Sequence, residues 1–146
     1  MTITIGTKRN LPDAHYIGRN GSSSLGNPFQ VAGNTVANVV KGYRFYLALV
    51  STKGLTPGTA AQQVRADHPE LNLKVSSAWA IPTAAQMVKE LQGLKAQLKE
   101  GKPISLACHC YNKPAEWTGD YQWKCHAEPI AGWLMWQLAQ DKLPVA

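Results

Sequence analysis

The sequence predicts a small single-domain α/β fold with a Rossmann-like, mostly parallel sheet flanked by helices. The chain has 146 residues, the length of one ordinary domain, and no linker-like stretch divides it, so we expect residues 1–146 to form a single unit. Short runs that favour strands alternate with segments of helical periodicity, and one helical segment leads directly into a strand. This order favours strands that pair in parallel and are covered by helices.

Two short strands are expected near the N-terminus. The runs ITIGT and AHYIG are rich in strand-favouring residues, and KRNLPD between them carries the Asn, Pro and Asp of a turn. RNGSSSLGNPF follows, and its Gly, Ser and Asn content predicts a loop. A strand, a glycine-rich loop and a helix in this order are typical of nucleotide-binding α/β folds.

Two long helices follow from hydrophobic periodicity. Asn34 or Thr35 can cap the first, whose apolar face consists of Val36, Val39, Val40, Tyr43, Leu47 and Val50. Thr83 and Gln86 form a capping box for the second, which ends at Gly101 and has an apolar face of Met87, Leu91, Leu94 and Leu98. Between the two, TAAQQVRADH is expected to form a short helix and VSSAWAIP an edge strand.

A last strand and a last helix enclose an insert. PISLACHC alternates as a strand does, which puts Cys108 and Cys110 on one face about 7 Å apart. The final helix is expected over about 129–140, with Pro129 in a favoured first-turn position. Residues at about 111–124 form the insert between the two Cys/His pairs.

The charge balance bears on partners. Fifteen Lys and Arg outnumber nine Asp and Glu, for a net charge of +6. An excess of cations favours polyanionic or phosphorylated partners, although a merely soluble basic surface is equally consistent with it.

The N-terminus MTITIGTKRN has no signal-peptide core, and no apolar run is long enough to cross a membrane. We therefore expect no membrane partner. Three cysteines, an odd number, argue against a disulfide framework and for a reducing compartment. The expected location is the cytoplasm of a bacterium or of a phage-infected host cell.

The cysteines and two of the four histidines gather between residues 105 and 130. The pair Cys125-His126 lies close to the start of the last helix, where the helix dipole stabilises a thiolate. A set of three cysteines and one histidine suits a closed tetrahedral zinc site, here Cys108, Cys110, Cys125 and His126. The spacing is uncommon for zinc, so two alternatives stay open: a reactive thiol without metal, and plain core packing.

The loop YIGRNGSSSLGNPF matches neither a P-loop nor a dinucleotide fingerprint. It still supplies closely spaced backbone N–H groups, serine hydroxyls and a cation, which together suit a phosphate. The candidate ligand-binding residues are Arg19, Ser24, Gly26 and Asn27. A long flexible turn is the alternative.

The insert YNKPAEWTGDYQWK interleaves aromatic residues with lysines. Such a pattern can stack on a base and hold a phosphate, but aromatic residues in a loop more often pack to hold the loop in place. We favour the packing interpretation.

These motifs resemble the uncharacterised family known as domain of unknown function 4326, found in phage and bacterial genomes. The resemblance runs from Tyr16 to about Leu134 and implies these signature positions: Ile17, Gly18, Arg19, Leu25, Gly26, Asn27, Pro28, Phe29, Cys108, Cys110, Cys125 and His126. Two departures are visible. Fourteen residues separate the Cys pair from the Cys-His pair where the family has a few, and Glu128 replaces the usual Asp.

Three functions fit this pattern. The first is the binding of a nucleotide or another phosphorylated metabolite between the loop YIGRNGSSSLGNPF, called the Gly/Ser loop, and the four proposed zinc ligands, called the Cys/His cluster. If the protein is an enzyme, the candidate catalytic residues are Cys108, Cys125 and Glu128. The second is sequestration of a nucleotide signal without catalysis. The third is a zinc-stabilised nucleic-acid module. The model with one shared pocket requires the strands AHYIG and ISLAC to run parallel.

Overall fold

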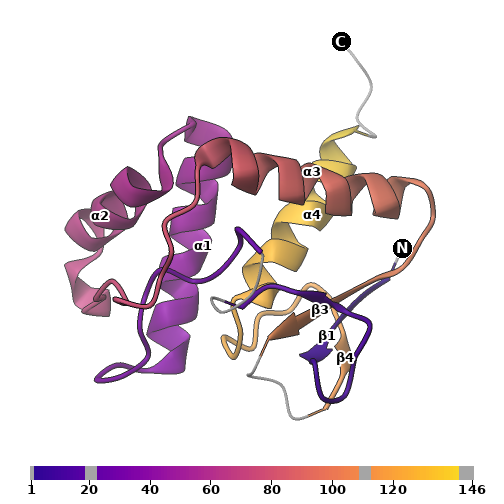
Figure 1. The fold of residues 1–146 in the computed structure, drawn as a ribbon, viewed down its shortest axis with the longest axis horizontal. Helices are drawn as coiled ribbons and strands as arrows, with labels where there is room; N and C mark the ends of the chain where they lie inside the picture. Colours follow the sequence, from indigo (N-terminus) through magenta and orange to yellow (C-terminus); the bar gives the residue numbers. More distant parts are fainter. Residues whose placement is uncertain (1, 19–22, 109–112, 142–146) are drawn as a thin grey trace.

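Four strands form one mixed sheet in this computed structural model, which describes residues 2–18, 23–108 and 113–141 (Figure 1). In chain order they are β1 (Ile3–Thr7), β2 (His15–Tyr16), β3 (Ile104–Cys108) and β4 (Ala115–Glu116). β3 lies between β2 and β1 and pairs in parallel with both. β4 pairs antiparallel with the other side of β1. The predicted α/β class is confirmed, but the sheet is mixed, because the insert contributes a strand of opposite direction.

The helices are α1 (Val36–Lys53), α2 (Pro57–Asp67), α3 (Ala84–Lys99) and α4 (Ala127–Asp141), with a short 3-10 turn, η1 (Pro69–Leu71). The expected caps are present: the Thr35 hydroxyl accepts from the Asn38 N–H, and Thr83 and Gln86 form the capping box of α3. α4 begins at Ala127, slightly earlier than expected. None of the helices in the described part of the chain is long and apolar enough to span a membrane.

The prediction that VSSAWAIP forms an edge strand is wrong. Only Val75 makes an isolated bridge, with Phe29. The chain turns immediately afterwards, because the Trp79 N–H donates to the Ser76 carbonyl and the Ala78 N–H to the Ser76 hydroxyl. Such local bonds take the place of a strand ladder.

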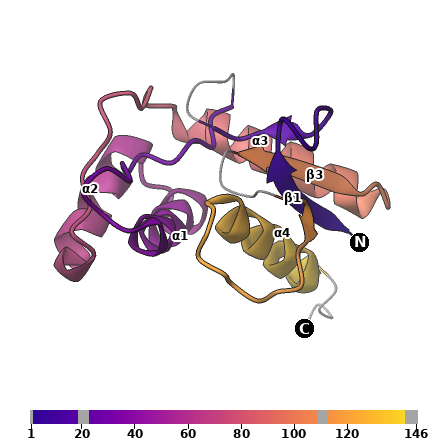
Figure 2. The same ribbon diagram turned by 90° about the horizontal axis from the view of Figure 1, so that it is seen from below.

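α4 connects the two halves of the fold. Figures 1 and 2 show the sheet at one end of the molecule and α1 and α2 at the other. α4 contacts β1 and β3 on one side and α1 on the other, while α3 packs on β3 and α4. The core that results draws on every layer and includes Ile5, Leu106, Tyr43, Met87, Leu91, Ile130 and Leu134.

The parallel strands direct three loops toward one end of the sheet. β1, β2 and β3 end at Thr7, Tyr16 and Cys108, and parallel strands present their carboxyl ends on the same side. We call this side the carboxyl edge. The Gly/Ser loop follows β2 there, and Cys108 is the last residue of β3, so two of the predicted motifs leave the sheet together.

Candidate functional site at the carboxyl edge

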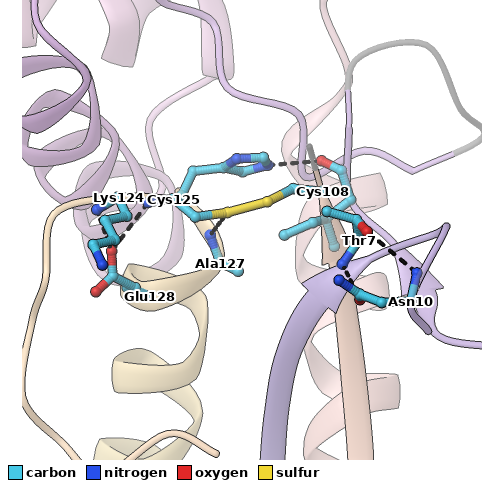
Figure 3. Close-up of a disulfide and its surroundings, with 9 residues drawn as sticks. Thr7, Asn10, Cys108, Lys124, Cys125, Ala127 and Glu128 are labelled. Carbon is cyan, nitrogen blue, oxygen red and sulfur yellow. Dashed lines mark hydrogen bonds between the residues drawn. A yellow bond between two sulfur atoms is a disulfide. The ribbon is translucent and has the colours of Figure 1, made fainter. Parts of the chain in front are cut away.

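Cys108 at the end of β3 is bonded to Cys125, just before α4. The two form a disulfide, and both residues are buried (Figure 3). Their Cα atoms are 7.3 Å apart, and the Ala127 N–H donates to the Cys125 sulfur at 3.4 Å. The expectation of reduced thiols is therefore wrong for this pair. The reason is tertiary: the parallel sheet brings the end of β3 to the N-terminus of α4, where the sulfurs meet.

His126 links this cluster to the start of the Gly/Ser loop. Its Nε2 lies 2.8 Å from the carbonyl oxygen of Ile17. A carbonyl only accepts hydrogen bonds, so Nε2 carries the proton. The His126 ring also meets the edge of the Tyr43 ring, with centroids 5.0 Å apart. A metal bound by His126 in this orientation would have to use Nδ1.

Tyr43 extends the same network to the LGNPF segment. Its hydroxyl donates to the carbonyl oxygen of Leu25 at 2.7 Å. Burial, followed by the nearby Tyr46 and Glu90, raises the pKa of Tyr43 well above its ordinary value. The hydroxyl therefore stays protonated and remains a donor. Through Tyr43 and His126, the signature segments around Ile17, Leu25 and Cys125 form one connected unit.

Glu128 anchors the end of the insert. This carboxylate is completely buried in the first turn of α4 and accepts backbone N–H groups of Gln122, Lys124 and Cys125 (Figure 3). Charge-assisted bonds to main-chain donors are among the stronger ones in proteins. As a catalytic candidate, Glu128 is therefore already fully engaged in holding the chain that carries Cys125.

The Gly/Ser loop is fixed to α3 by a second carboxylate, Glu90. One oxygen accepts the Ser24 N–H and hydroxyl at 2.7 and 2.9 Å, and the other contacts the Ser23 hydroxyl and His15 Nε2. Burial raises the pKa of Glu90, but the bonds from His15 and the two serines outweigh it and lower the pKa below its ordinary value of 4.5. The carboxylate is therefore charged at neutral pH.

This carboxylate cluster lines a cavity of about 690 Å³ between the Gly/Ser loop and α3. Its wall includes His15, Ser23, Ser24, Lys89 and Glu90. Sequence reasoning identified Ser24 but missed His15 and Glu90, which lie 75 residues apart and belong to no motif. The predicted ligand-binding residue Ser24 thus lines this cavity, but its N–H and hydroxyl donate to the Glu90 carboxylate.

Gly26 and Asn27 are buried and shape the loop from within. The Asn27 side-chain oxygen accepts the Phe29 N–H at 2.9 Å, and its amide donates to the Val39 carbonyl at 3.4 Å. The first bond is within the loop, and the second fixes the loop to α1. Gly18 is needed for a different reason, since a Cβ there would collide with the Tyr16 ring.

Two predicted residues, Arg19 and Cys110, lie outside the described residues. Among the described ones, no group of three or more metal-binding side chains comes together. Of the four proposed zinc ligands, Cys108 and Cys125 are joined to each other and His126 is beside them. The donor types fit zinc only when the disulfide is reduced.

The insert packs its aromatic rings against α1. Tyr121 stacks on Trp123, and the Arg44 guanidinium lies over both rings, 4.7 Å and 5.9 Å from their centroids. Trp117 meets the edge of Tyr121, and the Lys41 ammonium lies 5.5 Å from the Trp123 centroid. This agrees with the packing interpretation of the insert.

The comparisons with known proteins give one match. The model of the family described as domain of unknown function 4326 matches residues 4–136. No curated protein and no solved structure matches the chain. The match runs from within β1 to within α4 and includes all the contacts between signature segments described above. The chain therefore belongs to the family of domain of unknown function 4326.

Proposed function

We propose that this protein binds a nucleotide or another phosphorylated small molecule at the carboxyl edge, between the Gly/Ser loop and the Cys/His cluster. The observation that carries the proposal is the parallel pairing of β2 with β3, in which Tyr16 is opposite Ala107. Because of it, the Gly/Ser loop and Cys108 leave the sheet side by side. The bond between His126 and the Ile17 carbonyl supports the same view.

The expected ligand is an anion because the chain as a whole is basic and the loop sequence contains a cation. The net charge is +6, and Arg19 follows Gly18 at the start of the loop. The donors of Ser23 and Ser24 are engaged by Glu90. A phosphate at this edge would therefore depend on Arg19 for charge, with the serines fixing the loop rather than the ligand.

Binding without turnover is the form of this function that the contacts favour. Glu128, the candidate acid or base, is occupied by three backbone N–H groups. Cys108 and Cys125, the candidate nucleophiles, are bonded to each other. An enzyme on the same ligand is the alternative, and it requires the reduced pair.

Zinc is our proposal for the reduced state. Cys108, Cys110 and Cys125 would supply three thiolates and His126 its Nδ1, a set typical of closed structural sites. Such an ion would stabilise the junction of β3 with α4. We also propose that β2, β3 and β1 form a small Rossmann-like core, to which the insert adds β4.

A nucleotide panel tests the proposal. We expect at least one nucleotide or sugar phosphate to raise the melting temperature of the wild-type protein, and Arg19→Ala to weaken this effect while leaving the unliganded melting temperature nearly unchanged. Lys74→Ala, an exposed cation far along the chain, is the matched control and should respond like wild type. A panel without any shift in the wild type contradicts the proposal. A single-stranded oligonucleotide in the same panel tests the nucleic-acid alternative.

A further inference from the structure

A second cavity lies away from the 690 Å³ cavity, between α1, α4 and the insert. Its volume is about 310 Å³, at the small end of the range for ligand pockets. The wall is mostly apolar and aromatic, with Leu47 from α1, Tyr121 from the insert, and Pro129, Trp133 and Trp136 from α4. Figure 2 shows the insert running from β4 past α4 to α1, so it forms one side of this space.

Arg44 contributes a cationic side chain to the wall of this cavity. Arg44 lines it and lies over the Tyr121 ring, but forms no salt bridge with any carboxylate in the described part of the chain. Among the residues that the structure describes, no acidic one lines the cavity. Glu128 does not line the cavity, and its carboxylate is held by three backbone N–H groups. Burial raises the pKa of Tyr121, so its hydroxyl adds no negative charge either. The guanidinium is therefore available to an anion.

One residue of the cavity wall, Trp133, has a donor without a partner. The indole N–H of Trp133 is buried and has no hydrogen-bond acceptor among the described residues. A buried donor left without a partner costs about 1–3 kcal/mol. On the same helix, Trp136 is 49% exposed, so part of its ring remains free to cover a ligand. Aromatic walls and a cation that forms no salt bridge among the described residues together define the chemistry of an occupant.

We propose that this cavity is a second binding site, for a planar aromatic ring that carries an anionic group. The ring would lie against the indoles of Trp133 and Trp136, where stacking favours flat molecules. Its anionic group would pair with the Arg44 guanidinium, which has donors in a fixed planar arrangement. Both an aromatic carboxylate and a nucleoside phosphate have this chemistry. The site is separate from the proposed phosphate site and does not depend on it.

Three probes separate the contributions in calorimetric titrations of the wild-type protein. 2-Naphthoate has the ring and the charge, 2-naphthamide has the ring alone, and cyclohexanecarboxylate has the charge on a non-planar ring. We expect 2-naphthoate to bind at least about tenfold more tightly than either analogue, since a tenfold change corresponds to the loss of one modest interaction. Adenosine monophosphate is the fourth probe and distinguishes the two sources of the ligand.

Variants locate the binding. Arg44→Met keeps a long apolar stem over Tyr121 and should weaken 2-naphthoate about tenfold or more. Lys53→Met, the matched loss of an exposed cation on α1, should leave affinity unchanged. The indole N–H resonance of Trp133, assigned by its absence in Trp133→Phe, should shift on binding. Equal affinity of Arg44→Met and wild type for 2-naphthoate, or no binding of 2-naphthoate and of adenosine monophosphate, overturns the proposal.

The result is independent of the proposed function. Arg19→Ala should leave 2-naphthoate binding intact, and Arg44→Met should leave intact the melting shift caused by a nucleotide that binds at the carboxyl edge. If adenosine monophosphate binds and its affinity responds to Arg19 but not to Arg44, it occupies the carboxyl edge. In that case the binding of 2-naphthoate alone decides whether the second site exists.

Discussion

The imidazole of His126 lies 2.8 Å from the carbonyl oxygen of Ile17, which is 109 residues away in the sequence. The bond joins the two halves of the family's signature, because Ile17 precedes the Gly/Ser loop and His126 follows Cys125. It is also buried, so its loss leaves a carbonyl without a donor.

Replacing His126 tests how much this junction contributes to stability. His126→Phe keeps a ring against Tyr43 but removes the donor, and we expect the free energy of unfolding to fall by about 1–3 kcal/mol in urea titrations. His68→Phe is the matched control. His68 stacks on Phe45 and pairs with exposed Glu70, and such a surface pair contributes about 0–1 kcal/mol. Equal losses for both variants would mean that the Ile17 contact contributes nothing specific.

The Glu90 carboxylate should make stability depend on pH. Its pKa is lower in the folded protein than in the unfolded chain, so its contribution is fully present above the unfolded value of about 4.5 and is lost as pH falls through the folded value. We expect Glu90→Gln to lower the free energy of unfolding by about 1–3 kcal/mol at pH 7. The difference from wild type should shrink below about pH 4.5.

Glu100→Gln provides the comparison for that measurement, because Glu100 is exposed and forms an ion pair with exposed Lys102. Its effect at pH 7 should stay below about 1 kcal/mol. A Glu90→Gln deficit that is the same at pH 7 and pH 3.5 would show that lost packing, and not the charge, is responsible.

Replacing two helix glycines by alanine should change the stability of the protein in different ways. A Cβ at Gly93 in α3 has nothing within 4 Å, so Gly93→Ala should stabilise by up to about 1 kcal/mol through helix propensity. A Cβ at Gly132 in α4 would collide with the Tyr121 hydroxyl. Gly132→Ala should therefore displace the insert, reduce or reverse the expected gain, and increase cleavage of the insert in limited proteolysis. Equal stabilisation by both substitutions would show that the insert adapts freely.

Oxidation and zinc compete for the same sulfurs. Protein purified under reducing conditions without chelator should carry about one zinc ion per chain, bound by Cys108, Cys110, Cys125 and His126. A two-electron oxidant that joins Cys108 to Cys125 removes two thiolate ligands and should release the ion. Elemental analysis checks the content, and mapping of alkylated cysteines checks the bond. Less than about a tenth of an equivalent in reduced protein would exclude the zinc site.

Local patterns predicted most elements of the fold. The apolar spacing of Val39, Tyr43 and Leu47 and the capping box of Thr83 identify α1 and α3, because helix formation depends on neighbours three and four residues apart. The order of elements favoured parallel pairing, which the structure has between β2 and β3, although their register could not be predicted from the sequence. The strand predicted for VSSAWAIP does not form, because hydrogen bonds to Ser76 turn the chain. Strand propensities of single residues do not include such local hydrogen bonds.

The candidate site was predicted only in part. The signature segments do come together, but their contacts are made by Tyr43, Glu90 and Glu128, none of which was assigned such a role. Glu128 holds the backbone of nearby Lys124 and Cys125, a local contact that its acidic side chain in the first turn of α4 could have indicated. Glu90 and Tyr43 sit on helices and reach the loop across 66 and 18 residues, so tertiary packing makes their contacts. The pairing of Cys108 with Cys125 was missed for the same reason, since sequence spacing does not reveal which thiols become neighbours.

The two-residue strand β4 has a consequence for self-association. Without it, β1 would be the outermost strand, and its five residues would offer unpaired main-chain groups to strands of other molecules. With β4 and β2 in place, both borders of the sheet consist of strands of only two residues, too short to template a long intermolecular ladder. Shortening the insert would thus expose β1 and raise the tendency of the protein to aggregate, even if every residue of the carboxyl edge were retained.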